Sequence, residues 1–234
     1  MTLKDRIILV TGGSSGIGLE TARMLRSKGA RVIIVARNEE RLNAAAQEHD
    51  LYPIQGDVSR EADVLRIYDT VNREFGRLDA LINNAGYGYF DLLEDMDVEK
   101  FEAVFATNVT GAMLMAREAA KLFKAQKYGN IVNISSTAGL KGFARGTAYA
   151  ATKFALRGMT ECWRAELRQY NVRVILINPS EVQTDFVAAS GREPRPFNPT
   201  KLQAVDIAHA ICATLEMEDR GFVTEMTIWA TNPR

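Results

Sequence analysis

The sequence predicts an α/β protein built on one doubly wound, mainly parallel β-sheet with helices on both faces. Three observations support this fold class. Short apolar runs rich in β-branched residues alternate with longer stretches of helical periodicity along the whole chain. Most of the short runs are apolar at every position, as strands buried on both faces of a parallel sheet are. A glycine-rich string joins the first short run to the first helical stretch.

The elements follow one another in a regular order. Seven strands are predicted, at residues 6–10, 31–36, 51–55, 80–83, 130–135, 173–178 and 222–229. Helices are predicted at residues 17–28, 38–47, 61–75, 98–126, 149–170 and 204–215, because apolar residues recur there on one helical face. The rhythm breaks at residues 179–201, where prolines, a glycine and polar residues predict a long loop. Long loops in compact domains are commonly binding loops, so we expect a substrate loop near residues 180–201.

Length and composition indicate one globular domain. The chain has 234 residues, which is long for a mini-domain and short for two full domains, so residues 1–234 are expected to form a single domain. Hydrophobic residues make up 47% and charged residues 25%, the balance of an ordinary globular protein. Cys162 and Cys212 lie in predicted helices and are expected to be free, buried thiols.

Charge and hydropathy exclude several classes of partner. Lys plus Arg and Asp plus Glu number 29 each, so the formal net charge is zero. Nucleic acid and anionic membrane surfaces attract proteins with a basic excess, so neither is an expected partner. The chain lacks an apolar run long enough for a membrane span, and its N-terminus lacks the apolar stretch of a signal peptide. A cytoplasmic protein that binds small molecules is the expectation.

The glycine-rich string is a candidate phosphate site. It reads TGGSSGIG at residues 11–18 and leads from a strand directly into a helix. Glycine lets the backbone approach a pyrophosphate closely, and the helix N-terminus supplies N–H groups and positive potential. The spacing of Gly12 and Gly16 differs from the G-x-G-x-x-G fingerprint of Rossmann folds, and a tight turn without a ligand is the alternative.

Arg37 favours NADP(H) over NAD(H) as the dinucleotide. In dinucleotide-binding folds, an acidic residue at the end of the second strand holds the ribose 2′-hydroxyl, whereas a nearby Arg accommodates a 2′-phosphate. Here the second strand ends in Val35-Ala36-Arg37, so a guanidinium stands where NAD-binding folds place a carboxylate. A guanidinium pairs well with phosphate. The alternative is a solvated surface arginine.

Tyr149 and Lys153 are candidate catalytic residues. They lie one turn apart at the start of a predicted helix, so their side chains project from one face. A neighbouring ammonium lowers the pKa of a phenol and makes it useful as an acid and base. Ser136 follows the strand at residues 130–135 and is expected at the same edge of the sheet, although serine after a strand is more often a turn or N-cap residue.

Taken together, these motifs resemble those of the short-chain dehydrogenase/reductase family, in its compact single-domain branch. The resemblance covers nearly the whole chain and implies a Rossmann-like fold. The motifs that carry it, in the family's order, are TGGSSGIG at residues 11–18, Asp57-Val58, Asn83-Asn84-Ala85-Gly86, Asn108, Ser136, and Tyr149 with Lys153.

The resemblance implies a catalytic role for Asn108, Ser136, Tyr149 and Lys153. Tyr149 would donate a proton to a carbonyl oxygen during reduction and take it back during oxidation, while Ser136 orients that carbonyl. Lys153 would bond the nicotinamide ribose as well as lowering the pKa of Tyr149. Asn108 would anchor a water that relays protons, and the cofactor would supply the hydride. This mechanism needs no metal, and none is expected at His49 or His209.

The resemblance also implies a set of cofactor contacts. Asp57 would accept a hydrogen bond from the adenine amino group beside the Val58 N–H, and Asn83 would brace the sheet. The expected cofactor-binding residues are Gly12, Ser14, Ser15, Gly16, Ile17, Gly18, Arg37, Asp57, Val58, Asn84, Ala85, Gly86, Tyr149, Lys153, Pro179, Val182 and Thr184.

One segment departs from the family's pattern. After the sixth strand the family has Pro-Gly followed by a Thr that holds the nicotinamide carboxamide, whereas here Ser180 follows Pro179. Thr184 and the Val182 backbone remain in place. The substitution puts the size of the substrate in doubt, and we expect a narrower pocket floor.

These features predict an NADP(H)-dependent oxidoreductase that converts a carbonyl to an alcohol or the reverse. Expected partners are the small-molecule substrate and, from the family resemblance, further copies of the chain in a homodimer or homotetramer. Two alternatives are a non-catalytic dinucleotide-sensing regulator and a sugar-nucleotide epimerase or dehydratase. Substrate selection is expected from Tyr87, Tyr89, Leu140, Phe143, Arg145, Phe186 and Phe197. Lys141 and Arg145 point to an anionic substrate, whereas the aromatic residues suit an aliphatic or ring ketone.

Overall fold

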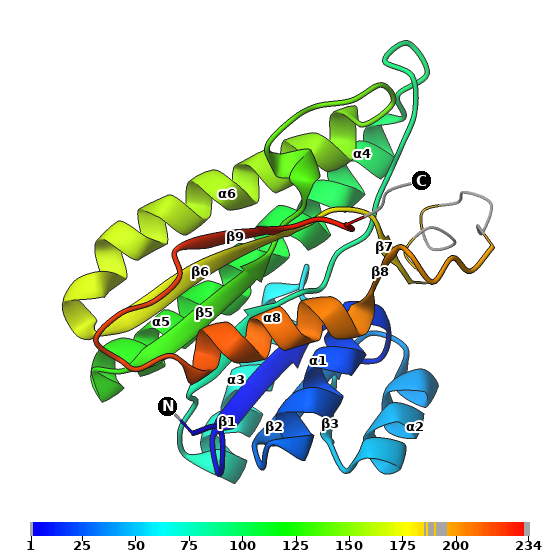
Figure 1. Cartoon of the computed structure of the whole chain (residues 1–234). Helices are drawn as coiled ribbons and strands as arrows, with labels where there is room; N and C mark the ends of the chain where they lie inside the picture. The colour runs from blue at the N-terminus through cyan, green and yellow to red at the C-terminus, as the bar shows by residue number, and fades with distance from the viewer. Residues whose placement is uncertain (1, 185, 187–189, 191–195, 232–234) are drawn as a thin grey trace.

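Seven parallel strands form the central sheet of the fold (Figure 1). The computed structural model describes residues 2–184, 186, 190 and 196–231. Within these residues the strand order is β3-β2-β1-β4-β5-β6-β9, and all neighbouring strands are parallel. The strands are β1 (Ile7–Thr11), β2 (Arg31–Ala36), β3 (Tyr52–Gln55), β4 (Ala80–Asn83), β5 (Gly129–Ile134), β6 (Val172–Pro179) and β9 (Glu225–Ile228). The order reverses between β1 and β4, which confirms the predicted doubly wound fold.

Helices cover both faces of this sheet. The helices α1, α2 and α8 pack on one face, and α3, α5 and α6 pack on the other. Their bounds are α1 (Gly16–Ser27), α2 (Glu39–His49), α3 (Glu61–Phe75), α5 (Ala112–Gln126), α6 (Thr147–Leu167) and α8 (Ala204–Glu216). In β1, Ile8 and Val10 contact the first layer, and Ile7 and Leu9 contact the second. A strand covered on both faces must therefore be apolar at each position, as the sequence pattern indicated. None of the helices in the described residues is long and apolar enough to span a membrane.

The helix predicted at residues 98–126 contains an interruption. It consists of α4 (Val98–Phe105), a π-helical segment η1 (Ala106–Gly111), and α5. At Gly111 a Cβ would lie 2.8 Å from Cγ2 of Val58, so only glycine lets the helix approach the loop after β3 this closely. Apolar periodicity does not detect a π segment, because the chain is helical before and after it. Such segments are frequent at functional sites.

The predicted loop at residues 179–201 contains a short strand. β7 (Val182–Gln183) pairs in parallel with β8 (Leu202–Gln203) to form a second, two-stranded sheet. Part of the predicted substrate loop, residues 185, 187–189 and 191–195, lies outside the described residues.

The two cysteines differ in exposure. Both are free, but Cys212 is buried and Cys162 is exposed. The expectation that both thiols are buried is therefore wrong for Cys162, because it lies on a side of α6 that faces solvent. Burial raises the pKa of the Cys212 thiol to about 12, so this thiol stays protonated at neutral pH.

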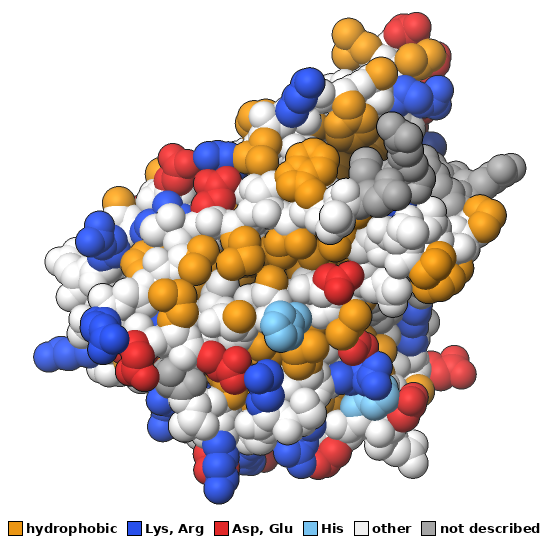
Figure 2. Space-filling model, in the orientation of Figure 1, with side chains coloured by type: hydrophobic (Ala, Val, Ile, Leu, Met, Phe, Trp, Pro, Cys, Tyr) orange, Lys and Arg blue, Asp and Glu red, His pale blue; other side chains and the backbone are white. Residues whose placement is uncertain are grey.

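An apolar band crosses the face of the molecule drawn in Figure 2, over the region where β9 runs between α6 and α8. β9 is the last strand of its sheet. Met226 and Ile228 of this strand are partly buried, and the side chain that follows it, Trp229, is 66% exposed. The last strand therefore brings apolar side chains to the surface.

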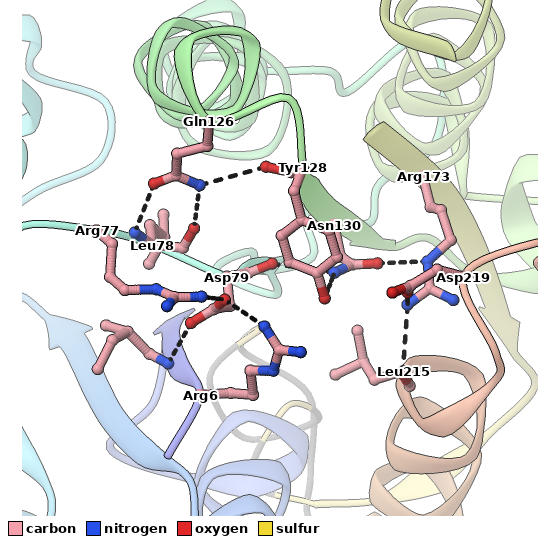
Figure 3. A network of polar contacts seen from close by, with 11 residues as sticks. Arg6, Arg77, Leu78, Asp79, Gln126, Tyr128, Asn130, Arg173, Leu215 and Asp219 are labelled. Atoms are coloured by element: carbon pink, nitrogen blue, oxygen red, sulfur yellow. Dashed lines mark hydrogen bonds and ion pairs between the residues drawn. The ribbon is translucent and has the colours of Figure 1, made fainter. Parts of the chain in front are cut away.

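A buried carboxylate joins the start of β1 to the start of β4 (Figure 3). Asp79 immediately precedes β4 and is 1% exposed. Its Oδ2 accepts a hydrogen bond from the backbone N–H of Ile7 at 2.8 Å, and its Oδ1 accepts one from Nη1 of Arg6 at 2.9 Å. Arg77 pairs with the same carboxylate. Two guanidinium groups and a backbone donor therefore compensate the buried charge.

The same network continues to β6 and α8. Nε of Arg173 donates to Oδ1 of Asn130 at 2.6 Å, and Nδ2 of Asn130 donates to the backbone oxygen of Asp79 at 3.0 Å. The Arg173 guanidinium also donates to the backbone oxygens of Leu215 and Met217, at 3.3 and 3.1 Å, where α8 ends. A cation is favourable at a helix C-terminus. The network thus fixes four strands and one helix relative to one another.

Replacement of the central carboxylate should destabilise the fold. In Asp79→Asn, the amide offers one acceptor oxygen to donors that shared two, so we expect the free energy of unfolding to fall by about 2 to 3 kcal/mol. The matched control is Asp50→Asn, because Asp50 pairs with Arg26 but its side chain is 82% exposed, and the loss there should stay below about 1 kcal/mol. Urea unfolding followed by circular dichroism measures both. Equal losses in the two variants would contradict this account of Asp79.

Candidate active site

A cleft of about 880 Å³ lies at the carboxyl ends of the strands of the main sheet. Open parallel sheets bind ligands at this edge, and the volume is near the upper end of the range for small-molecule sites. Most of the residues predicted from the sequence line it. They are Gly12, Ser14, Ser15, Gly16, Ile17, Arg37, Asp57, Val58, Asn84, Ala85, Gly86, Ser136, Tyr149, Lys153, Pro179, Val182 and Thr184. Gly18 and Asn108 do not belong to the lining.

The glycine-rich loop after β1 forms one wall of the cleft. Gly12 and Gly16 have φ angles of 65° and 53°, which glycine adopts at little cost. A Cβ on Gly12 would lie 2.9 Å from Nδ2 of Asn84, so this loop packs directly on the loop after β4. The N-cap residue of α1, Ser15, makes no side-chain cap hydrogen bond, and the first turn of α1 holds no acidic residue. The N-terminus of α1 therefore presents N–H groups and its positive dipole end to a ligand.

Gly18 lies behind the glycine-rich loop, where it allows close packing. A Cβ on Gly18 would lie 2.3 Å from the backbone oxygen of Gly12. The loop is also fixed by Thr11, whose Oγ1 accepts hydrogen bonds from the backbone N–H groups of Asn84 and Ala85 at 3.0 Å each. Gly18 and Thr11 thus shape the loop without lining the cleft.

Two arginines lie at one end of the cleft. Arg37 follows β2, Arg41 lies one turn later in α2, and both line the cleft. Oδ1 of Asn38, the N-cap residue of α2, accepts a hydrogen bond from the backbone N–H of Arg41 at 2.8 Å. The two acidic residues of this turn, Glu39 and Glu40, are not in the lining. The sequence analysis missed Arg41, although its place in the first turn of the helix that follows Arg37 was a usable signal.

Asp57 lies in the loop after β3, where local hydrogen bonds fix its orientation. Its Oδ1 accepts from the backbone N–H and the hydroxyl of Ser59, at 2.9 and 2.7 Å. Its own backbone N–H donates to Oδ2 of Asp63 at 2.9 Å. This hydrogen bond is the largest cause of the lowered pKa of Asp63; pairing with Arg66 also lowers that pKa, and burial raises it. The Asp57 carboxylate is therefore held as an acceptor at the wall of the cleft.

Ser136, Tyr149 and Lys153 all line the cleft. Ser136 follows β5, and its Oγ accepts from the backbone N–H of Ala138 at 3.1 Å. Lys153 is 6% exposed; its Nζ donates to the backbone oxygen of Ile134 at 2.9 Å and lies 5.6 Å from the centroid of the Tyr149 ring. Burial lowers the pKa of Lys153 to about 8, because the ammonium loses its hydration. The cleft thus holds a hydroxyl, a phenol and an ammonium group together.

Asn108 lies in η1 and is 2% exposed. Its Nδ2 donates to the backbone oxygen of Tyr87 at 2.9 Å and to Oγ1 of Thr152 at 3.1 Å, and its Oδ1 accepts from the backbone N–H of Tyr87 at 3.1 Å. Thr152 in turn donates to the backbone oxygen of Tyr149 at 2.7 Å. The Asn108 side chain therefore ties η1 to the turn of α6 that carries Tyr149. The sequence analysis did not single out Thr152, and the role of Asn108 in holding a water stays a prediction.

The loop after β6 closes the floor of the cleft. The backbone N–H of Ser180, the residue that departs from the family pattern, donates to the backbone oxygen of Ile228 in β9 at 2.8 Å. A Cβ on Gly16 would lie 3.5 Å from Cβ of Thr184, so this loop contacts the start of α1. The residues expected near the nicotinamide are therefore close to the glycine-rich loop. Ser180 itself lines the cleft.

The residues predicted to select the substrate divide into two groups. Tyr87, Leu140, Lys141, Phe143 and Phe186 line the cleft, and Tyr89, Arg145 and Phe197 do not. Arg145 lies outside the lining and pairs with Asp91 at 3.2 Å. The sequence analysis missed Phe90 and Trp229, which also line the cleft. Neither belongs to a recognisable motif, so only the fold brings them to the site.

Comparison with known proteins agrees with this geometry. Residues 6–195 match the family model described as short chain dehydrogenase. The uncharacterised oxidoreductase YxnA of Bacillus subtilis strain 168 is 41% identical over 192 residues, which are 79% of this chain and 54% of that protein. An uncharacterised oxidoreductase of Staphylococcus aureus strain USA300 is 31% identical over 232 residues, which are 97% of each chain. The chain belongs to the short-chain dehydrogenase family of oxidoreductases, which bind nicotinamide dinucleotides.

Solved structures superpose closely on nearly the whole chain. A metagenomic short-chain oxidoreductase in complex with NADP is 32% identical, with a TM-score of 0.86, and the match covers 99% of this chain and 100% of that one. Levodione reductase is 28% identical, with a TM-score of 0.89 and 97% of each chain covered. An alcohol dehydrogenase from the archaeon Thermococcus sibiricus, complexed with 5-hydroxy-NADP, is 25% identical, with a TM-score of 0.88 and 99% of each chain covered.

Proposed function

We propose that this protein is an NADP(H)-dependent oxidoreductase that interconverts a ketone or aldehyde and the corresponding alcohol. The observation that carries the proposal is the meeting of Ser136, Tyr149 and buried Lys153 in one cleft with the glycine-rich loop. Each of these groups has an ordinary structural use when it occurs alone. Their convergence beside a site suited to phosphate supports a catalytic one.

The residues of the cleft fit a dinucleotide. The uncapped N-terminus of α1 and the positive-φ glycines leave room and N–H donors for a pyrophosphate. Asp57 is oriented as an acceptor for the adenine amino group, beside Val58. Thr184 and the Val182 backbone would hold the nicotinamide carboxamide near the start of α1. When bound, the reduced nicotinamide supplies a hydride to the carbonyl carbon.

In this proposal the side chains of the cleft orient the carbonyl oxygen and supply its proton. The hydroxyl of Ser136 donates a hydrogen bond to the carbonyl oxygen and holds it near Tyr149. The Tyr149 O–H bond breaks as its proton moves to that oxygen, which becomes the alcohol hydroxyl, and Tyr149 regains a proton from solvent. The ammonium of Lys153 stabilises the phenolate left on Tyr149, and it would hydrogen-bond the ribose of a bound nicotinamide cofactor. Asn108 keeps Tyr149 in place through Thr152.

The two arginines at the other end of the cleft support a preference for NADP(H). Arg37 and Arg41 line the end where the adenosine ribose would lie, and neither of the nearby acidic residues Glu39 and Glu40 reaches the lining. A 2′-phosphate pairs well with guanidinium groups. Two similar solved structures are complexes with NADP and with 5-hydroxy-NADP, which also favours this cofactor.

Removal of the phenol hydroxyl should separate catalysis from binding. In Tyr149→Phe we expect ketone reduction to fall by at least about 10²-fold, because the proton donor is lost, while NADPH affinity stays near the wild-type value. Loss of NADPH absorbance measures turnover, and fluorescence titration measures binding. Tyr170→Phe, which lies outside the cleft lining, is the matched control. Full activity in Tyr149→Phe would refute the assignment, and NADPH binding without turnover by the wild-type protein would favour a regulatory protein.

Loss of one arginine should change the choice of cofactor. In Arg37→Gln we expect NADPH affinity to drop by about tenfold or more, the effect of one charge-assisted hydrogen bond, and NADH affinity to remain unchanged. Titration with both cofactors measures the two affinities. Arg168→Gln, at the far end of α6, serves as the control. An equal drop for NADH and NADPH would place the 2′-phosphate elsewhere.

The rate of reduction should depend on the charge of Lys153. Below its pKa of about 8 the ammonium is positive, and above it the amine is neutral. Reduction also needs a proton on Tyr149, so a rise in pH acts on both groups in the same direction, and kcat/KM should fall above about pH 8. In Lys153→Arg the fall should begin at higher pH, because a guanidinium stays charged. A flat profile for the wild-type enzyme between about pH 6 and pH 10 would contradict this role.

A further inference from the structure

Two aromatic rings pack against Tyr149 in the cleft, and a third packs against one of these. The ring centroids of Phe90 and Phe186 each lie 5.4 Å from that of Tyr149, at interplanar angles of 53° and 57°. The ring of Phe143 lies 6.1 Å from that of Phe90. All of them line the cleft, and Phe143 is 49% exposed although it is a large apolar side chain. Phe143 therefore offers ring surface to a ligand.

Two glycines hold these rings in place. A Cβ on Gly88 would lie 2.3 Å from Cε2 of Phe90 and 3.1 Å from Cζ of Phe186. A Cβ on Gly146 would lie 2.7 Å from Cζ of Phe143. Any larger residue at either position would displace a ring. The two glycines therefore leave the space that the aromatic wall, formed by Phe90, Phe143 and Phe186, occupies.

Buried charge is scarce in the cleft. Among the described lining residues, Lys153 is the only buried charged side chain, and it belongs to the catalytic group. Lys141 is exposed to solvent, and Glu181 lies 3.7 Å from Lys201. Arg145, the other cation expected here, is outside the lining and paired with Asp91. Apart from Lys153, the described lining residues therefore include no buried cation that could receive a substrate carboxylate or phosphate.

We propose that the substrate is an uncharged ketone with a flat aromatic ring attached to its carbonyl carbon. This inference rests on the proposed function, because it places the carbonyl oxygen at Tyr149 and Ser136. The ring then lies against the faces and edges of Phe90, Phe143 and Phe186. Aromatic pairs attract one another beyond the effect of buried area, so such a wall favours a flat ring over a puckered one of similar size. Apart from Lys153, which serves the reaction, the described lining residues include no buried cation to compensate a buried anion, and this disfavours a charged ring.

Three matched ketones test this choice of substrate. Phenyl methyl ketone, cyclohexyl methyl ketone and 4-acetylbenzoate share the same reacting group and differ in aromaticity or charge. We expect kcat/KM with NADPH to be about three- to tenfold higher for the phenyl ketone than for the cyclohexyl ketone, the effect of one aromatic pair. The charged ketone should be the poorest of the three. Binding of each ketone to the enzyme with NADP⁺ is measured separately by saturation-transfer NMR.

Two variants test the wall itself. Phe143→Leu keeps an apolar side chain but removes the ring, and Gly146→Ala displaces the ring without replacing it. Both should remove most of the preference for the phenyl ketone while NADPH affinity stays at the wild-type value. Phe101→Leu is the control, because Phe101 contacts Phe105 in α4 and does not line the cleft.

The outcomes distinguish the two proposals. Equal kcat/KM and equal binding for the phenyl and cyclohexyl ketones would overturn the aromatic substrate and leave the oxidoreductase intact. A preference for 4-acetylbenzoate would overturn it in favour of an anionic substrate. Preferred binding of the phenyl ketone without any turnover would support the aromatic site and contradict the proposed reaction. If none of the ketones binds or reacts, both proposals fail.

Discussion

Every strand of the main sheet runs in the same direction, and the position of the site depends on this constraint. In a parallel sheet the loops that follow the strands, and the N-termini of the helices that come next, gather at one edge. Gly12 after β1, Asp57 after β3 and Ser136 after β5 therefore line one cleft, although they are far apart in the sequence. If one strand ran in the opposite direction, the loop that follows it would lie at the other edge of the sheet and would not line the cleft.

Buried charges have different partners at the amino ends and at the carboxyl ends of the strands. At the amino ends of the strands, Asp79 and Arg173 have several charged or backbone partners, so their burial is compensated. At the cleft, buried Lys153 donates a hydrogen bond to the backbone oxygen of Ile134, and burial lowers its pKa. A buried amine with a lowered pKa costs stability, and perturbed pKa values of this kind cluster at functional sites. The amino ends of the strands thus hold compensated charges, whereas the cleft holds an amine whose burial is not compensated by an ion pair among the interactions described for it.

Much of the fold and part of the site were predictable because their signals are local. Apolar runs report strands buried on both faces, and the positions of Tyr149 and Lys153 lie within one helical turn. The interruption of the long helix at η1 was not predictable, since it depends on the contact between Gly111 and Val58, which come from different segments. Thr152 is similar: its hydroxyl connects Asn108 to Tyr149 only after η1 and α6 pack together. Phe90 and Trp229 belong to no motif, and the fold alone brings them to the cleft.

The sequence by itself determined the fold class, the glycine-rich loop and the candidate catalytic residues, because periodicity and short motifs encode them along a continuous stretch of chain. The tertiary structure decided which of these residues face the cleft and which support it. It assigned Gly18 to packing against the oxygen of Gly12, paired Arg145 with Asp91 outside the lining, and seated Phe143 on Gly146. These outcomes depend on distances between segments remote in the sequence, which are set only when helices and loops pack on the sheet.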